Sequence, residues 1–170
     1  ESPLDVAFIA GEPNYGDAIP SPVHGDSTKV TLGEGDTPCV HLTTLSGRLF
    51  LDKLYAKLEF LNPTGSFKDR GTATMLSVAR EYGVNELVED SSGNAGASVS
   101  AYAARAGIKS HIFVPADAPE AKLRQIKAYG TEVHPIEGPR EAVTAAAIAY
   151  SREHGLVYAS HMLSPYFAEG

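Results

Sequence analysis

The second half of the chain repeats one pattern, in which a short apolar run precedes a helix-like segment that ends at a glycine. Glycine is common just beyond a helix because it adopts the left-handed backbone without steric penalty. Helices are expected over 66–82, 95–105, 119–129 and 140–154, ended by Gly83, Gly107, Gly130 and Gly155. Strands are expected over 86–91, 110–114, 132–136 and 156–160. Such alternation predicts an α/β fold, an open parallel sheet with helices on both faces.

The first part of the chain is less regular. Residues 1–30 are rich in proline, glycine and aspartate and predict a loop or an extended arm, and 33–38 predicts a tight turn. One or two short strands are expected over 48–61, with the apolar set Leu49, Leu51, Leu54, Tyr55, Leu58 and Phe60. We divide the chain into an incomplete part of a larger domain (1–84), a small α/β domain (85–163) and a return to the larger domain (164–170).

Composition excludes several classes of partner. The net charge is −7, and the 14 basic residues are scattered rather than clustered, so no nucleic-acid partner is expected. Because the chain lacks a run of about 18 apolar residues, no membrane span is expected either. The lone Cys39 cannot form an internal disulfide, which favours a reducing, cytoplasmic setting.

The histidines do not predict a metal site. They are His24, His41, His111, His134, His154 and His161. These residues form no HExxH pattern, and a single cysteine cannot supply paired thiolates, so no metal is expected.

The segment Asn-Pro-Thr-Gly-Ser-Phe-Lys-Asp-Arg-Gly (62–71) places a lysine in the first turn of an expected helix. A lysine that reacts with an aldehyde must lose its proton, although its ordinary pKa is about 10.4. Phe67 and the apolar positions of the helix can shield Lys68 from water. The plain alternative is a solvated lysine beside the charged pair Asp69 and Arg70.

A second segment, Ser-Ser-Gly-Asn-Ala-Gly (91–96), follows an expected strand and opens a helix. Unpaired backbone N–H groups at a helix N-terminus favour anions, and serine and asparagine side chains add donors, so the loop predicts a carboxylate-binding site. Gly93 is expected to allow a sharp turn. A simple helix cap is the plain alternative. The spacing of this loop matches neither GxGxxG nor the P-loop pattern.

Together, the two segments resemble the pyridoxal-phosphate (PLP) enzymes of fold type II, the tryptophan synthase β family. Within that family the wording of 63–71 is similar to the threonine synthase branch, and the Gly-Asp-Thr-Pro turn at 35–38 is similar to a turn near the start of these enzymes. The chain also resembles a portion of such an enzyme, because it starts without methionine and stops within an apparent motif.

The resemblance implies PLP as cofactor and Lys68 as the catalytic residue that forms a Schiff base with it. Phe67 and Asn94 would contact the cofactor. The substrate carboxylate would bind to Ser91, Ser92, Gly93, Asn94 and Ala95. The substrate would be a small amino acid, and a homodimer is the assembly expected of the full-length protein.

The implied activity is that of a lyase in amino-acid biosynthesis, which converts O-phosphohomoserine to threonine and phosphate. In many threonine synthases an arginine suited to the phosphate stands where this chain has Phe167. One alternative is therefore a serine/threonine dehydratase-like enzyme. Another is a non-catalytic, truncated PLP-fold binding module, since a 170-residue piece alone is expected to be inactive.

Overall fold

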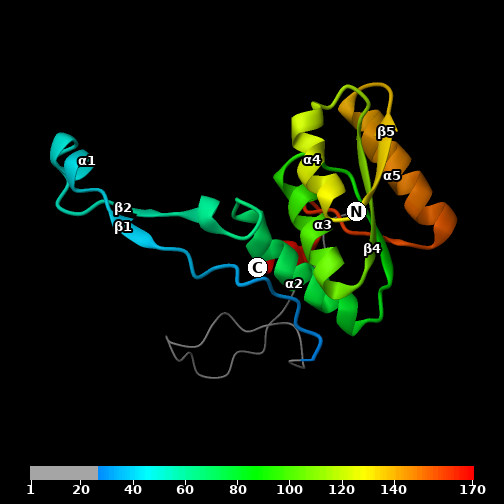
Figure 1. Cartoon of the computed structure of the whole chain (residues 1–170), viewed down its shortest axis with the longest axis horizontal. Helices are drawn as coiled ribbons and strands as arrows, with labels where there is room; N and C mark the ends of the chain where they lie inside the picture. Colours follow the sequence, from blue (N-terminus) through cyan, green and yellow to red (C-terminus); the bar gives the residue numbers. More distant parts are fainter. Residues whose placement is uncertain (1–26) are drawn as a thin grey trace.

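The computed structural model of the protein describes residues 27–170 (Figure 1), so most of the arm expected over 1–30 lies outside the described residues. The elements, in chain order, are β1 (Cys39–His41), α1 (Thr43–Arg48), β2 (Tyr55–Lys57), the 3₁₀ helix η1 (Glu59–Leu61), α2 (Lys68–Glu81), β3 (Glu86–Glu89), α3 (Asn94–Ala106), β4 (Lys109–Pro115), α4 (Glu120–Ala128), β5 (Glu132–Ile136), α5 (Arg140–His154), β6 (Val157–Tyr158) and α6 (Pro165–Glu169).

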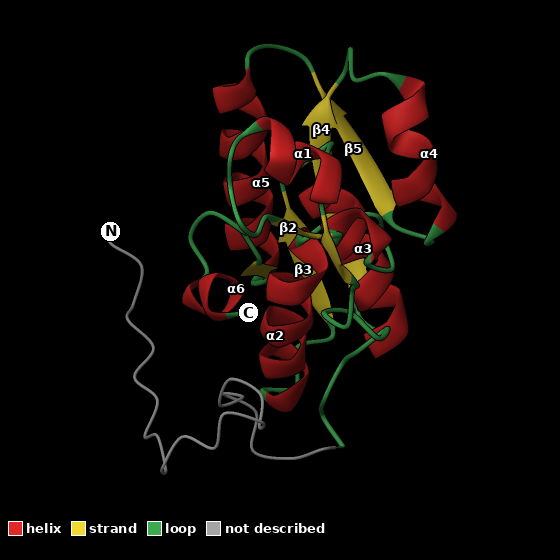
Figure 2. Ribbon diagram, turned by 90° about the vertical axis from the view of Figure 1, so that its left-hand side faces the viewer, coloured by secondary structure: helices red, strands yellow, loops and turns green. Residues whose placement is uncertain are grey.

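The centre of the molecule is a four-stranded parallel sheet in the order β5-β4-β3-β6. Helix α5 covers one face, and α3 and α4 cover the other (Figure 2). This arrangement confirms the predicted α/β class, the parallel sheet and the helices on both faces. The carboxyl ends of the strands therefore meet at one edge, where ligands bind in open sheets of this kind.

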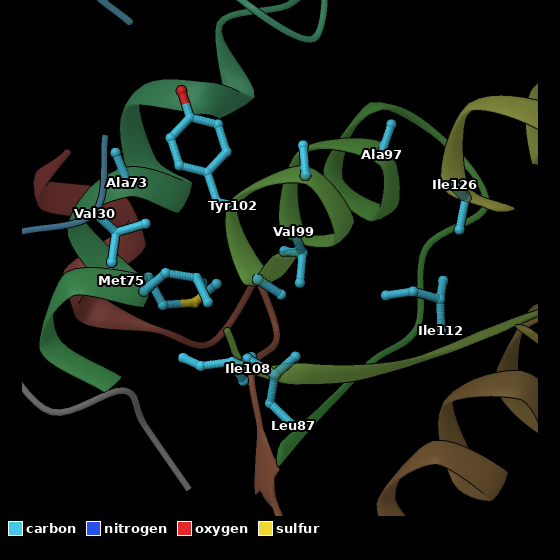
Figure 3. Close-up of a cluster of buried hydrophobic side chains, with 14 of the residues drawn as sticks. Val30, Ala73, Met75, Leu87, Ala97, Val99, Tyr102, Ile108, Ile112 and Ile126 are labelled. Carbon is cyan, nitrogen blue, oxygen red and sulfur yellow. The ribbon is translucent and has the colours of Figure 1, made fainter. Parts of the chain in front are cut away.

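Side chains alternate along β3 and separate the two apolar layers. Leu87 belongs to the larger core beneath α2, α3 and α4 (Figure 3), whereas Val88 packs with Phe113 and residues of α5. Because side chains of a strand alternate between faces, Glu89 shares the face of Leu87, and Asp90 shares the face of Val88.

Two predicted helix ends have the expected cause. Helices α3 and α5 end before Gly107 (φ 71°) and Gly155 (φ 65°), both left-handed. The strands expected over 86–91 and 156–160 are shorter than predicted, with β6 reduced to Val157–Tyr158.

The prediction for 48–61 was only partly right. One strand, β2, pairs antiparallel with β1, while α1 and η1 occupy regions where no helix was expected. Figure 1 shows this segment extending away from the sheet. Most of its apolar set is exposed and only Leu54 and Leu58 are half-buried, so the apolar letters here do not mark a core.

Helix α2 packs along α3, and α6 packs on α2. The division of the chain into domains at residues 84 and 163 stays a prediction. Contacts of α2 with α3 and α6 cross both proposed boundaries, so the packing of these helices does not separate the proposed domains. Within residues 27–170, each helix is too short or too polar to cross a membrane.

Candidate active site

Lys68 is the first residue of α2, directly after the turn at 63–66. The backbone N–H of Lys68 donates to Ser66 Oγ at 3.3 Å, so Ser66 supports the helix start, although Phe67 holds the N-cap position itself. The Lys68 Nζ lies 4.5 Å from the centre of the Phe67 ring and 5.6 Å from that of Phe167. Among residues 27–170, no carboxylate pairs with this amine. Within the described part of the chain, the recorded neighbours of this amine are therefore two aromatic rings.

Asp69 joins the lysine turn to the next helix. Its fully buried carboxylate accepts from the Thr64 backbone N–H (2.7 Å), the Thr64 hydroxyl and Ser98 Oγ (2.6 Å). Ser98 Oγ also lies 2.8 Å from Thr72 Oγ1. We call Asp69, Thr72 and Ser98 the helix seam. Since its members belong to the first two turns of α2 and α3, the seam holds the N-termini of both helices at the same end of the molecule.

Arg70 does not pair with Asp69. Its guanidinium forms two 2.9 Å hydrogen bonds with Glu59 and donates at 3.0 Å to the carbonyl of Gly35. Asn62 donates to Glu59 (2.8 Å) and accepts from the backbone N–H of Gly35 (3.0 Å). The hydrogen bond from Arg70 lowers the pKa of Glu59 below its ordinary value. These contacts tie the 33–38 turn to the lysine segment.

The loop over 91–95 leads from β3 into α3. Its members predicted to bind the substrate are Ser91, Ser92, Gly93, Asn94 and Ala95. The backbone N–H of Gly93 donates to Ser91 Oγ at 3.3 Å, and the first N–H bonded within the helix is that of Ala97, to Gly93 O. The N–H groups of the preceding turn have no intrahelical acceptor, as at any helix start. The loop thus presents several donors at one end of α3.

The turn does not require glycine at 93, contrary to expectation. Gly93 has an ordinary φ of −107°, and an added Cβ would meet only Ser91 Oγ, at 3.9 Å. The essential glycine is Gly96, where a Cβ would lie 1.8 Å from the carbonyl oxygen of Ser91. Close approach of α3 to the loop requires the missing side chain at 96.

Two buried acidic residues that were not predicted as site residues precede the loop. Asp90 is paired with Arg140 (2.8 Å) and accepts from Thr144 Oγ1 (2.6 Å) on the α5 face. Glu89 faces the other way, and its Oε1 lies 2.6 Å from His161 Nδ1. Burial raises the pKa of Glu89, opposed by the hydrogen bond from His161. No spacing rule could have found this pair, because its members are 72 positions apart.

A different polar cluster lies nearer the amino ends of β4 and β5. His111 Nδ1 lies 2.9 Å from His134 Nε2, and His111 Nε2 lies 2.6 Å from Glu86 Oε1. His111, Glu132 and His134 could together hold a metal ion. However, these hydrogen bonds already satisfy both nitrogens of His111, and Lys109 pairs with Glu86 and Glu132. The three residues are close enough to bind a metal but already have other partners, so the expectation of no metal stays a prediction.

Helix α6 closes the region beside Lys68. Its Phe167 packs so tightly on α2 that a Cβ at Gly71 would lie 2.4 Å from the Phe167 carbonyl oxygen and 2.9 Å from its ring. The same ring meets His161 edge-on at 5.8 Å between centres. Phe167 is thus a neighbour of both the amine of Lys68 and the imidazole of His161.

Comparison with known proteins gives a consistent result. The family model for pyridoxal-phosphate dependent enzymes matches residues 30–170. The chain is 39% identical over 150 residues to the threonine synthase of Bacillus sp. (strain ULM1), covering 88% of this chain and 42% of the relative. It is 36% identical over 150 residues to that of Methanocaldococcus jannaschii, covering 88% and 37%.

Solved structures with the same fold include maize serine racemase, with a TM-score of 0.71 and 28% identity over 78% of this chain and 40% of that one. A pyridoxal 5′-phosphate-dependent aspartate racemase matches with a TM-score of 0.70 and 30% identity, over 79% and 42%. The chain spans about two fifths of the length of these proteins.

Proposed function

Because the chain belongs to the family of pyridoxal-phosphate dependent enzymes, we propose that it carries the lysine and the carboxylate-binding loop of a lyase of the threonine synthase kind. The observation that carries this proposal is the helix seam. Through the hydrogen bonds of Ser98 to Asp69 and Thr72, two groups begin neighbouring helices at one end of the fold. They are the Lys68 amine, which has no carboxylate partner in the described part of the chain, and the donor-rich loop at 91–95. A reaction at an amino acid needs both groups side by side.

The residues fit the cofactor chemically. Lys68 supplies an amine without a salt bridge among residues 27–170, and the Phe67 ring borders it. Asn94 supplies an amide that can donate to the 3′-oxygen of PLP. When bound, PLP supplies an electron sink for the carbanion formed at the substrate Cα.

The remaining roles belong to the chain itself. The hydroxyls of Ser91 and Ser92 and the N–H groups of the 93–95 turn would bind the substrate α-carboxylate, as helix N-termini bind anions. Lys68 Nζ would then take and return protons at Cα and Cβ. For O-phosphohomoserine the outcome is loss of phosphate, addition of water and formation of threonine.

A second candidate is a serine/threonine dehydratase-like activity. The observation that favours it is Phe167, an apolar ring 5.6 Å from Lys68 Nζ, where a phosphorylated substrate would need a cation. Arg70 cannot serve without breaking its pairing with Glu59, and Arg140 pairs with Asp90 on the other face of the sheet.

We further place the protein in the cytoplasm, as an enzyme that binds a small amino acid and neither nucleic acid nor membrane, and as a homodimer when full length. The net charge of −7 and the single, exposed Cys39 support the setting and the absence of those partners. The homodimer is proposed only from the resemblance.

The test is cofactor attachment to the full-length protein. After incubation with PLP, borohydride reduction and peptide mapping should find the cofactor mass on Lys68, and K68A should abolish it. The matched control K53A removes an exposed lysine and should leave labelling intact. Labelling elsewhere, or none, would support a non-catalytic module instead. Phosphate release from O-phosphohomoserine, compared with keto-acid formation from serine or threonine, then separates the two lyases.

A further inference from the structure

Burial of the Glu89 carboxylate carries a desolvation penalty that lowers the stability of the fold. Glu89 ends β3, its side chain is fully buried, and within residues 27–170 its Oε2 has no hydrogen-bond partner. A buried carboxylate with an unpaired oxygen costs stability, so packing alone does not explain it. Such groups are typical of functional sites.

Within residues 27–170, the hydrogen-bond partner of Glu89 is a histidine. Glu89 Oε1 lies 2.6 Å from His161 Nδ1. When the carboxylate is ionised it can only accept, so Nδ1 is then the donor. In the neutral imidazole the other nitrogen, Nε2, then carries no proton, and protonation of Nε2 gives the imidazolium that can act as an acid. A carboxylate that holds one nitrogen of a histidine leaves the other available for acid–base work.

The position of this pair relative to the site follows from its neighbours. Glu89 lies two residues before Ser91 and faces the side of the sheet covered by α2 and α3. His161 meets the Phe167 ring at 5.8 Å, and the same ring lies 5.6 Å from Lys68 Nζ. The Phe167 ring is therefore a shared neighbour of the imidazole and the lysine amine, and Glu89 connects the imidazole to the strand that leads into the carboxylate-binding loop.

The charges of this region suit a neutral leaving group. Glu89 is buried there, Arg70 is engaged by Glu59, and Arg140 is paired with Asp90 on the other face of the sheet. A leaving phosphate would face a buried carboxylate. A hydroxyl, in contrast, leaves only if an acid protonates it.

We propose that His161, oriented by Glu89, is a general acid that protonates the departing hydroxyl of a β-hydroxy amino acid. This inference rests on the proposed function and selects its dehydratase-like form. Lys68 Nζ takes the Cα proton, and the electrons of that bond form the Cα–Cβ double bond. The Cβ–O bond breaks, its electron pair stays on oxygen, and the proton of His161 Nε2 completes a water molecule. His161 regains a proton from solvent.

The leaving group provides the decisive test in the full-length holoenzyme. H161Q should lower kcat/KM for serine or threonine by about 10²–10⁴-fold, the usual contribution of a general acid. For β-chloroalanine, whose chloride departs without a proton, H161Q should cost less than about tenfold. H154Q, which changes an exposed histidine on the opposite face of the sheet, is the control and should change neither.

A second readout does not depend on activity. With ¹⁵N-labelled histidine, NMR well above the ordinary imidazole pKa of about 6.5 should show His161 protonated at Nδ1. E89Q should remove this preference, because a Gln amide can also donate, and should lower dehydration while sparing β-chloroalanine. Glu89 acts here as a positioning residue.

The outcomes are distinguishable. Equal losses on both substrates in H161Q, or an Nε2-protonated His161 in the parent protein, would overturn the inference. Labelled Lys68 with turnover of O-phosphohomoserine alone, or with no turnover of β-hydroxy amino acids, would leave the PLP-enzyme proposal standing and refute the role of His161. Failure to label Lys68 would refute both.

Discussion

At the scale of single residues, two glutamates show how the environment of a carboxyl group shifts its pKa. Glu89 is fully buried, and burial raises its pKa above 4.5 despite the hydrogen bond from His161. Glu59 is partly exposed, and the hydrogen bond from Arg70 lowers its pKa. The two residues should therefore affect stability with opposite dependence on pH.

The first prediction concerns E89Q. A raised folded pKa means that the stabilising contribution of Glu89 is complete below the unfolded pKa, near 4.5, and is lost as pH rises through the folded value. The free energy of unfolding of E89Q, relative to the parent, should therefore improve as pH increases from 4.5. Urea titrations at several pH values measure the difference.

The matched variant E59Q should behave in the opposite way. The lowered pKa of Glu59 means that its contribution is present above pH 4.5 and is lost as pH falls through the folded value. E59Q should thus become relatively less stable as pH rises. Parallel curves for the two variants would contradict this assignment of environments.

Residue patterns predict only part of this site. Lys68 and the 91–95 loop lie in local sequence motifs that indicate their chemistry, and the structure places both at helix starts. The pairing of Glu89 with His161 and the essential role of Gly96 come from contacts between distant or folded-back segments. A single sequence contains no periodicity that reports such contacts.

At the scale of elements, helix α3 depends on its approach to the preceding loop. We predict that G96A destabilises the protein by about 1–3 kcal/mol or more, since its Cβ would overlap the Ser91 carbonyl. G93A, in the same loop, should change stability by less than about 0.5 kcal/mol because its Cβ would meet only Ser91 Oγ, at an ordinary contact distance of 3.9 Å. Denaturant midpoints compare the two; equal effects would mean that the loop relaxes away from α3.

The elements that were predicted well are those whose ends are marked by a glycine in the sequence. Helices α3 and α5 are each closed by a left-handed glycine, so the sequence pattern and the local conformation agree at their ends. The segment over 43–61 lacks such agreement. Its leucines and aromatics suggest strands, but one short strand, a short helix and a 3₁₀ turn form instead, since little of the described chain packs against them.

At the scale of the whole molecule, apolar surface is distributed unevenly. The segment over 38–61 extends from the sheet, and its Phe50 is 97% exposed, whereas Phe113 in the sheet is 3% exposed. We predict that F50A changes the free energy of unfolding by less than about 0.5 kcal/mol, while F113A costs about 3–5 kcal/mol. Thermal or denaturant unfolding of the chain checks this. A large cost for F50A would show that the segment is covered by other protein.

The helix seam has a consequence for how this protein could change its substrate. The separation between amine and loop is set by Ser98 and Asp69 in the interior, not by the loop that we propose binds the substrate. Residues 91–95 can therefore vary in character while their distance from Lys68 stays constant. A change of that distance would have to begin with the buried hydroxyl of Ser98. Loss of this hydroxyl would remove the hydrogen bonds that join α2 and α3, and the two helices could then shift relative to each other.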